Sequence, residues 1–180
     1  MKNDYEIRGD TTVIFIKRRN GDVYECLIDT EDLPKAQQLS ATLALTKKHA
    51  DSHKMYVHFH KQLGFKKHTK RAFHRYLLDA PDGLVVDHIN GNPLDNRRGN
   101  LRLLTNAENM QNLNGPHRDS QTGARGVSLD KYGKRYQVFI RIDKVTHYLG
   151  LYETVEEANQ VASDFRASHM PFSEDAREAA

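Results

Sequence analysis

The chain has 180 residues, and the 38% that are hydrophobic support one or two domains with modest cores. Its net charge is +3 and its mean hydropathy is −0.75, so most of the surface is polar. The single cysteine, Cys26, excludes an internal disulfide and a thiolate-rich zinc site. The chain begins without a signal-like segment and has no apolar run long enough to span a membrane, so we expect a cytoplasmic protein.

Residues 1–72 predict a β-rich N-terminal region. Two β-rich segments, 12–16 and 24–28, flank Asn20-Gly21, a pair typical of a tight hairpin turn. Apolar residues near helical spacing predict a helix from Asp32 to roughly Lys48, and Met55–Phe59 is expected to be extended. Five histidines also lie in this region, and because no pair has a metal-ligand frame we expect surface or phosphate contacts from them: His49, His53, His58, His60 and His68.

The stretch from His60 to Arg75 is strongly basic and contains no acidic residue. A block of one charge favours a polyanionic partner such as DNA, and a solvated surface stretch is the alternative interpretation. Its cationic members are Lys61, Lys66, Lys67, Lys70, Arg71 and Arg75.

Residues 73–113 predict the element order strand, loop, strand, helix after a short helix at 73–78. The turn Pro81-Asp82-Gly83 ends that short helix, and residues 84–86 form a strand that delivers Asp87 and His88. A polar loop leads to a second extended segment at 101–104. Thr105 and Glu108 then have the spacing of a capping box at a helix start.

Four side chains in this segment are candidates for chemistry. Asp87 is a hard oxygen ligand suited to magnesium, and Asn109 offers a second oxygen ligand from the capped helix. His88 has a side chain suited to taking a proton from water. Asn100 either orients the His88 ring or holds the loop. The alternative is plain turn chemistry, because Asn and Asp are common in turns.

The runs DHINGN (87–92), LDNR (94–97), NLR (100–102) and Glu108-Asn109 resemble the HNH homing-endonuclease motif of phages and mobile introns. The resemblance implies a ββα-metal (His-Me finger) nuclease core in which Asp87 and Asn109 bind one Mg²⁺ or Mn²⁺ per chain. It implies His88 as the general base and catalytic Asn100 as the middle Asn of the motif. Asn109 stands where the motif name has its second His. His74-Arg75 resembles the preceding segment, and we expect DNA contact or packing from it. Arg97 and Arg98 are further predicted DNA contacts.

The C-terminal part predicts a linker at 114–123, a module at 124–170 and a tail at 171–180. The module should hold three strands and a helix from about Val155 to His169. Alternation along the strand 135–142 places its apolar residues on one face, packed against that helix. The opposite face is a candidate DNA-reading surface, with an ordinary charged surface as the alternative. Its predicted DNA contacts are Arg135, Gln137 and Arg141, and Phe139 lies on the same face. Arg125 is a further predicted DNA contact of the module.

This module resembles the APETALA-type (ethylene-response-factor) DNA-binding domain. The resemblance rests on Gly126-Val127, the strand 135–142, Tyr148-Leu149-Gly150 and the helix start at 154–158. Tyr136 stands where the family usually has tryptophan, a departure that bears on base preference.

We therefore expect an α+β protein: a ββα-metal core preceded by a β-hairpin region and followed by a small three-stranded antiparallel sheet packed on one helix. The predicted function is a metal-dependent DNA endonuclease that hydrolyses phosphodiester bonds. A DNA-binding regulator or architectural protein that does not cut is the alternative. We expect double-stranded DNA as the partner, no membrane, no small-molecule cofactor besides the metal, and a monomer with a dimer as the alternative. A phage or prophage gene acting in a bacterial host is the expected source.

Overall fold

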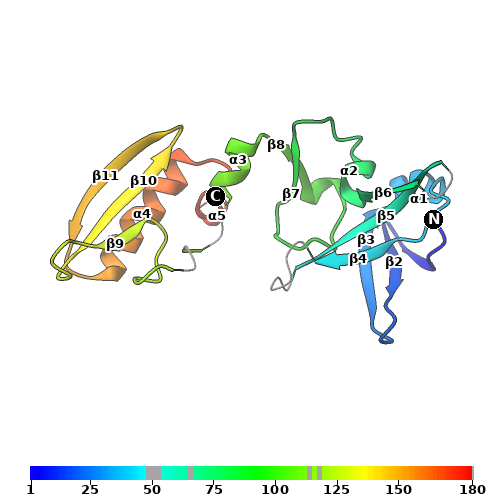
Figure 1. The fold of residues 1–180 in the computed structure, drawn as a ribbon, viewed down its shortest axis with the longest axis horizontal. Coiled ribbons are helices and arrows are strands. Elements are labelled where there is room, and N and C mark those ends of the chain that lie inside the picture. Colours follow the sequence, from blue (N-terminus) through cyan, green and yellow to red (C-terminus); the bar gives the residue numbers. More distant parts are fainter. Residues whose placement is uncertain (48–53, 65–66, 113–114, 117–118, 180) are drawn as a thin grey trace. The chain divides into compact units, whose positions relative to one another are not determined.

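The structure is a computed structural model that describes residues 1–180 apart from 48–53, 65–66, 113–114, 117–118 and 180 (Figure 1). The chain forms two compact units, Met1–Leu104 and Thr105–Ala180. The division therefore falls inside the predicted 73–113 segment. Part of the predicted linker 114–123 lies outside the described residues.

The first unit begins with the antiparallel sheet β1 (Tyr5–Arg8), β2 (Thr11–Lys17) and β3 (Val23–Asp29), in that spatial order. Gly21 has a φ of 93°, which glycine adopts without strain, and it makes the turn between β2 and β3. The hairpin expected from Asn20-Gly21 is confirmed.

The predicted helix from Asp32 to Lys48 is wrong beyond its first turns. A short η1 (Thr30–Asp32) and α1 (Leu33–Gln37) are followed by β4 (Ala44–Lys47). Leu43 is fully buried, but its backbone pairs with the side chain of Asn3 instead of a helical turn. Its N–H donates to Asn3 Oδ1 at 2.7 Å, and its carbonyl accepts from Asn3 Nδ2 at 3.1 Å. This long-range contact overrides the local apolar spacing.

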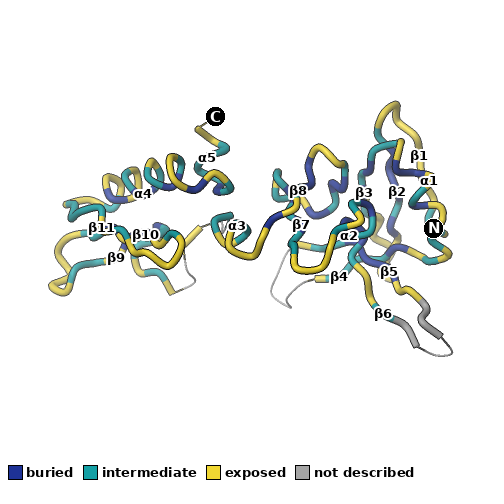
Figure 2. The backbone as a smooth tube through the Cα atoms, turned by 90° about the horizontal axis from the view of Figure 1, so that it is seen from above, coloured by how far each residue is buried: buried dark blue, intermediate teal, exposed yellow. Residues whose placement is uncertain are grey.

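A second antiparallel sheet is formed by β4, β5 (Met55–Gly64) and β6 (Lys67–Ala72), and α2 (Phe73–Leu77) follows β6 directly. One hydrophobic core joins both sheets and the two helices. Figure 2 shows its buried segments in dark blue. Its members include Ile14, Ile16, Ile28, Leu33, Val57, Phe59, Phe73 and Leu77.

The last elements of the first unit form the hairpin β7 (Val85–His88) and β8 (Leu101–Leu104), with η2 (Arg98–Asn100) before β8. The loop between the two strands runs beside β3. Leu27 N–H donates to the Leu94 carbonyl at 2.8 Å, and Asn96 N–H donates to the Leu27 carbonyl at 2.7 Å. The N-terminal sheet and the loop of the predicted motif are therefore one folded body.

The second unit starts with α3 (Asn106–Gln111), whose capping box between Thr105 and Glu108 is confirmed. It continues with the antiparallel strands β9 (Val127–Leu129), β10 (Tyr136–Ile142) and β11 (Val145–Tyr152), in the order β11-β10-β9. The helix α4 (Val155–His169) follows, and Val138 and Ile140 of β10 pack with Ala158 and Ala162 in a second core. The predicted sheet on one helix is thus present.

Two details complete this unit. Gly126 has a φ of 81°, and a Cβ there would lie 3.0 Å from the Phe139 carbonyl oxygen, so only glycine fits before β9. A helix that the sequence did not predict, α5 (Glu174–Glu178), occupies the expected tail. The buried guanidinium of Arg166 anchors it through two bonds to Asp175, at 2.7 and 2.9 Å. Among the described residues, no helix is both long and apolar enough to cross a membrane.

Candidate active site

The β7–β8 hairpin places the predicted acid and histidine side by side in the chain, opposite Arg102 and Leu101. Asp87 is half-buried, and its Oδ2 accepts from Nε of Arg102 on the facing strand at 2.9 Å. The guanidinium also forms an ion pair with that oxygen at 2.9 Å. This cross-strand pair fixes the orientation of the carboxylate.

His88 is buried, and aromatic rings from two other elements lie against it. The His74 ring of α2 meets it edge-on with centroids 5.2 Å apart, and the Tyr56 ring of β5 lies at 6.1 Å. Burial lowers the pKa of His88 below its usual value, and the charge of Lys54 adds to this effect. The hydrogen bond to Asn96 and the carboxylates of Asp87 and Asp95 oppose it. The imidazole is therefore neutral near pH 7, the form that can accept a proton.

Two asparagines near His88, Asn100 and Asn96, have different contacts. Asn100 accepts from the Asn90 N–H at 2.9 Å and donates to the Asp95 carbonyl at 2.8 Å. Of the two roles expected for Asn100, the structure shows that of holding the loop. Asn96 rather than Asn100 hydrogen-bonds to His88, with its Oδ1 3.4 Å from His88 Nε2. Sequence reasoning missed Asn96, because nothing in its pattern distinguishes it from the other loop asparagines.

The arginines of this region make their contacts within the first unit. Arg97 holds the buried carboxylate of Asp95 with two bonds of 2.8 Å. Arg98 holds the buried carboxylate of Asp32 at 2.9 and 2.7 Å. Arg75 donates to the carbonyls of residues 80, 81 and 84, which form the turn before β7. These three side chains build the scaffold, and the DNA contacts expected of them stay a prediction.

His74, the other expected contact in this segment, is buried, with only 8% of its surface exposed. Burial, together with the nearby His88 and Arg75, lowers the pKa of His74 to about 4. Of the two roles expected for His74, packing is the one the structure shows.

The other histidines of the first unit do not form a metal site in the part of the chain that the structure describes. His58 and His60 meet edge-on at 5.4 Å, and no cluster of three His, Cys, Asp or Glu side chains is found among the described residues. Burial lowers the pKa of His58 to about 4, with Lys70 and His60 contributing. The predictions for His49, His53 and the side chain of His68 lie outside the described residues.

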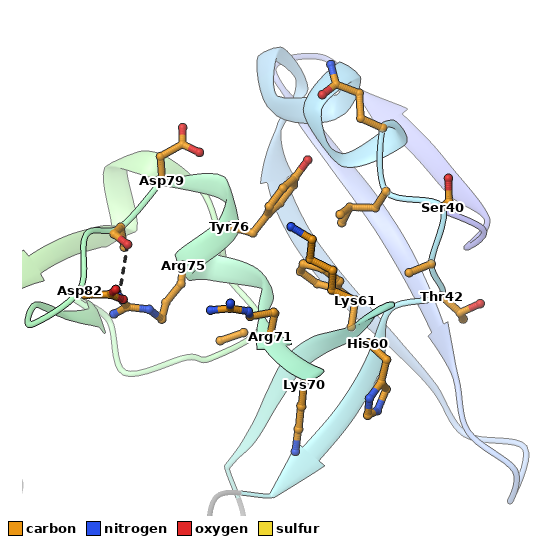
Figure 3. Close-up of a pocket in the computed structure, with 16 residues that line it drawn as sticks. Ser40, Thr42, His60, Lys61, Lys70, Arg71, Arg75, Tyr76, Asp79 and Asp82 are labelled. Carbon is orange, nitrogen blue, oxygen red and sulfur yellow. Dashed lines mark hydrogen bonds between the residues drawn. The ribbon is translucent and has the colours of Figure 1, made fainter. Parts of the chain in front are cut away.

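A cleft of 1090 Å³ opens elsewhere on the first unit, between α2, the β5–β6 ribbon and the segment 38–42 (Figure 3). Lys61, Lys70 and Arg71 line it from the ribbon, and Phe59 and Tyr76 form its aromatic wall. Asp79 and Asp82 lie on the α2 side. These cations belong to the basic stretch from His60 to Arg75.

In the second unit, the outer face of the sheet carries exposed aromatic and cationic side chains. Phe139 and Tyr148 are 42% and 57% exposed, with ring centroids 5.0 Å apart, and Arg135 and Arg141 are exposed. Gln137 is half-buried and donates to the Leu129 carbonyl at 3.0 Å.

Two other residues for which the sequence predicts a functional role, Arg125 and Asn109, also belong to this unit. Arg125 is partly buried and donates to the Gln111 carbonyl at 3.1 Å, so it holds the end of α3. Asn109 lies on α3, whereas Asp87 belongs to the first unit. Because these two residues belong to different units, the binding of one metal ion by both stays a prediction.

Comparison with known proteins bears directly on this hairpin and helix. Residues 79–111 match the HNH endonuclease family. The matched segment contains Asp87, His88, Asn96, Asn100 and Asn109. The chain is also 28% identical over 92 residues to Protein 3.8 of Escherichia phage T7, covering 51% of this chain and 75% of that protein. No solved structure matches the chain. Residues 79–111 are thus similar to an HNH endonuclease domain, a match that points to nuclease activity.

Proposed function

We propose that the protein is a metal-dependent DNA endonuclease that hydrolyses phosphodiester bonds, with His88 as the general base. The observation that carries the proposal is the buried imidazole of His88, whose pKa burial lowers, beside a carboxylate held by Arg102, inside the segment that matches the HNH family. A neutral imidazole takes a proton from the attacking water, and the resulting imidazolium is stabilised by the neighbouring carboxylates. The chemistry needs one ring nitrogen of His88 with a free lone pair.

The predicted ligand pair has donor atoms of the type that a hard divalent ion prefers. Asp87 supplies a carboxylate held by Arg102, Asn109 supplies an amide oxygen, and no thiolate site competes, because Cys26 is buried. Magnesium is commonly held by one or two protein oxygens, with water and phosphate completing its shell. We propose one Mg²⁺ or Mn²⁺ per chain, bound by Asp87 and Asn109. When bound, such an ion stabilises the negative charge that develops on the phosphate and the leaving oxygen.

Double-stranded DNA is the proposed substrate, and cationic surfaces of both units support this choice. Lys54 adds a positive charge near His88, and the cleft cations Lys61 and Arg71 offer phosphate contacts. In the second unit, the exposed sheet face with Arg135 and Arg141 is the proposed reader of base edges or phosphates. We further propose a phage-encoded homing-type enzyme acting as a monomer in the cytoplasm of a bacterial host, for which a nick in one strand is the natural product.

The test is the conversion of supercoiled plasmid to nicked or linear forms by the purified chain, with Mg²⁺, with Mn²⁺ and with EDTA. The proposal predicts cleavage with either metal and none with EDTA. DNA binding without cleavage under all three conditions would instead support a regulator or architectural protein.

A further inference from the structure

Asn96 is completely buried, and its side-chain amide has three neighbours. Nδ2 lies 3.4 Å from the Pro93 carbonyl oxygen and 3.3 Å from Cys26 Sγ, and Oδ1 lies 3.4 Å from His88 Nε2. A carbonyl oxygen can only accept a hydrogen bond, so the amide NH₂ group must face Pro93. The amide oxygen of Asn96 is therefore the atom that faces His88.

That orientation decides which nitrogen of His88 carries the proton. An amide oxygen also only accepts, so Nε2 must be the donor in its contact with Asn96. In a neutral imidazole the other nitrogen, Nδ1, then holds the lone pair. We propose that Asn96 is a positioning residue that fixes His88 as the Nε2-protonated tautomer and so makes Nδ1 the atom that takes the proton from water. This inference rests on the proposed nuclease function.

The N-terminal sheet holds the loop that carries Asn96 in place. Asn96 N–H donates to the Leu27 carbonyl at 2.7 Å, and Leu27 N–H donates to the Leu94 carbonyl at 2.8 Å, so β3 grips the loop on both sides of Asp95. Cys26 on the same strand is wholly buried, and burial raises the pKa of its thiol to about 12. The neutral sulfur accepts from Nδ2 and completes the fixation of the amide. The β-rich region at 1–72 thereby acquires a role in catalysis, through the orientation of His88.

The proton transfer balances within these groups. One O–H bond of the attacking water breaks as an Nδ1–H bond forms, and His88 becomes an imidazolium with protons on both nitrogens. The oxygen of that water then bonds to phosphorus as one ester P–O bond of the phosphodiester breaks, and the leaving oxygen takes a proton from solvent water. Nε2–H keeps its bond to Asn96 throughout, so the ring does not turn during the transfer.

The direct test is a ¹H–¹⁵N spectrum of the imidazole nitrogens of the full, metal-free chain at fixed neutral pH, with His88 assigned by comparison with His88→Ala. The proposal predicts a protonated Nε2 and an unprotonated Nδ1. A spectrum with His88 protonated at Nδ1 would overturn it. This readout is independent of cleavage, so a chain that does not cut DNA would sink the nuclease proposal and leave the tautomer measurable.

Variants extend the test to catalysis. Asn96→Leu removes the acceptor, and we expect a mixture of His88 tautomers and a fall in kcat of about 10-fold to 100-fold with KM within about twofold. Asn96→Asp keeps an acceptor of the same size and should retain the Nε2-protonated form. Ile28→Val, at a wholly buried position of β3, controls for lost stability alone and should keep both the tautomer and kcat. Wild-type tautomer and kcat in folded Asn96→Leu would contradict the role of Asn96.

Discussion

The arginines of the nuclease motif and those on the sheet face of the second unit lie in opposite environments. In the first unit, Arg97 and Arg98 are tied to buried carboxylates and Arg75 to backbone carbonyls. In the second unit, Arg141 lies exposed on the sheet face that carries Phe139 and Tyr148. Basic residues within a nuclease motif are therefore not by themselves evidence of DNA contact. We propose a division in which the first unit supplies the general base and the second reads the DNA.

The largest expected effect is that of His88→Ala. Loss of a general base commonly costs about 10²-fold to 10⁴-fold in rate. The variant should bind DNA nearly as well as the wild type, because the proposed reading surface lies in the other unit. Cleavage kinetics and fluorescence anisotropy on the same preparation separate the two effects. Near-normal turnover by a folded variant would remove His88 from the mechanism.

Acid should unfold the two units in different pH ranges. The pKa of buried His74 is lowered from 6.5 to about 4, so unfolding takes up a proton between these values and the first unit loses stability as pH falls through that window. The loss reaches about 3 kcal/mol near pH 4. Burial raises the pKa of Asp175, but the hydrogen bonds from Arg166 outweigh burial and lower the pKa below its usual 3.8. The stability that the charged Asp175 gives to the second unit is therefore retained until the pH falls below 3.8.

Hydrogen exchange resolved by peptide and followed across pH measures both units in one sample. His74→Phe should remove part of the loss between pH 6.5 and 4 in the first unit only. Equal loss of protection in the two units as the pH falls would contradict the expected difference in their acid stability.

Arg98→Ala should destabilise the first unit by about 2 kcal/mol, because it strands the carboxylate of Asp32, whose side chain is 5% exposed. The Arg98 side chain is 51% exposed, which keeps the cost below that of a fully buried pair. Arg141→Ala is the matched control and should change stability by less than about 0.5 kcal/mol. Urea unfolding of both variants provides the measurement, and equal midpoints would show that Arg98 is no scaffold residue.

Arg141→Ala should instead weaken DNA binding. The cost is about 1–3 kcal/mol with relaxed preference at one position if Arg141 contacts a base. If it contacts only phosphate, affinity falls evenly across sequences and the salt slope shrinks by about one. Arg135→Ala is expected to behave in the same two ways. Binding titrations at several salt concentrations distinguish these outcomes, and unchanged affinity in both variants would mean that the sheet face does not touch DNA.

The smallest effect is expected from the cleft of the first unit. Lys61→Ala and Arg71→Ala should each reduce the salt slope of DNA binding by about one and leave sequence preference unchanged. Lys131→Ala, an exposed lysine in the second unit, is the control for a change in net charge. A cleft variant that alters sequence preference would place base contacts in the first unit and break the proposed division.

Local signals made much of the fold predictable. The Asn20-Gly21 turn, the capping box at Thr105 and the alternation of β10 each determine an element from adjacent residues, and each is observed. The segment after Gln37 was not predictable, because the side chain of Asn3, some forty residues away, hydrogen-bonds to the backbone of Leu43. Asn96 was missed for the same reason: its partner Cys26 lies seventy residues earlier in the chain.

The division of labour is tested most directly by sequencing the cut sites that the full chain leaves in a random DNA library with Mg²⁺. The wild type should show metal-dependent cuts at preferred sequences, and His88→Ala should show almost none. Arg141→Ala combined with Arg135→Ala should still cut, but over a broader set of sequences. Identical cut-site profiles for this double variant and the wild type would contradict the division between a cutting unit and a reading unit.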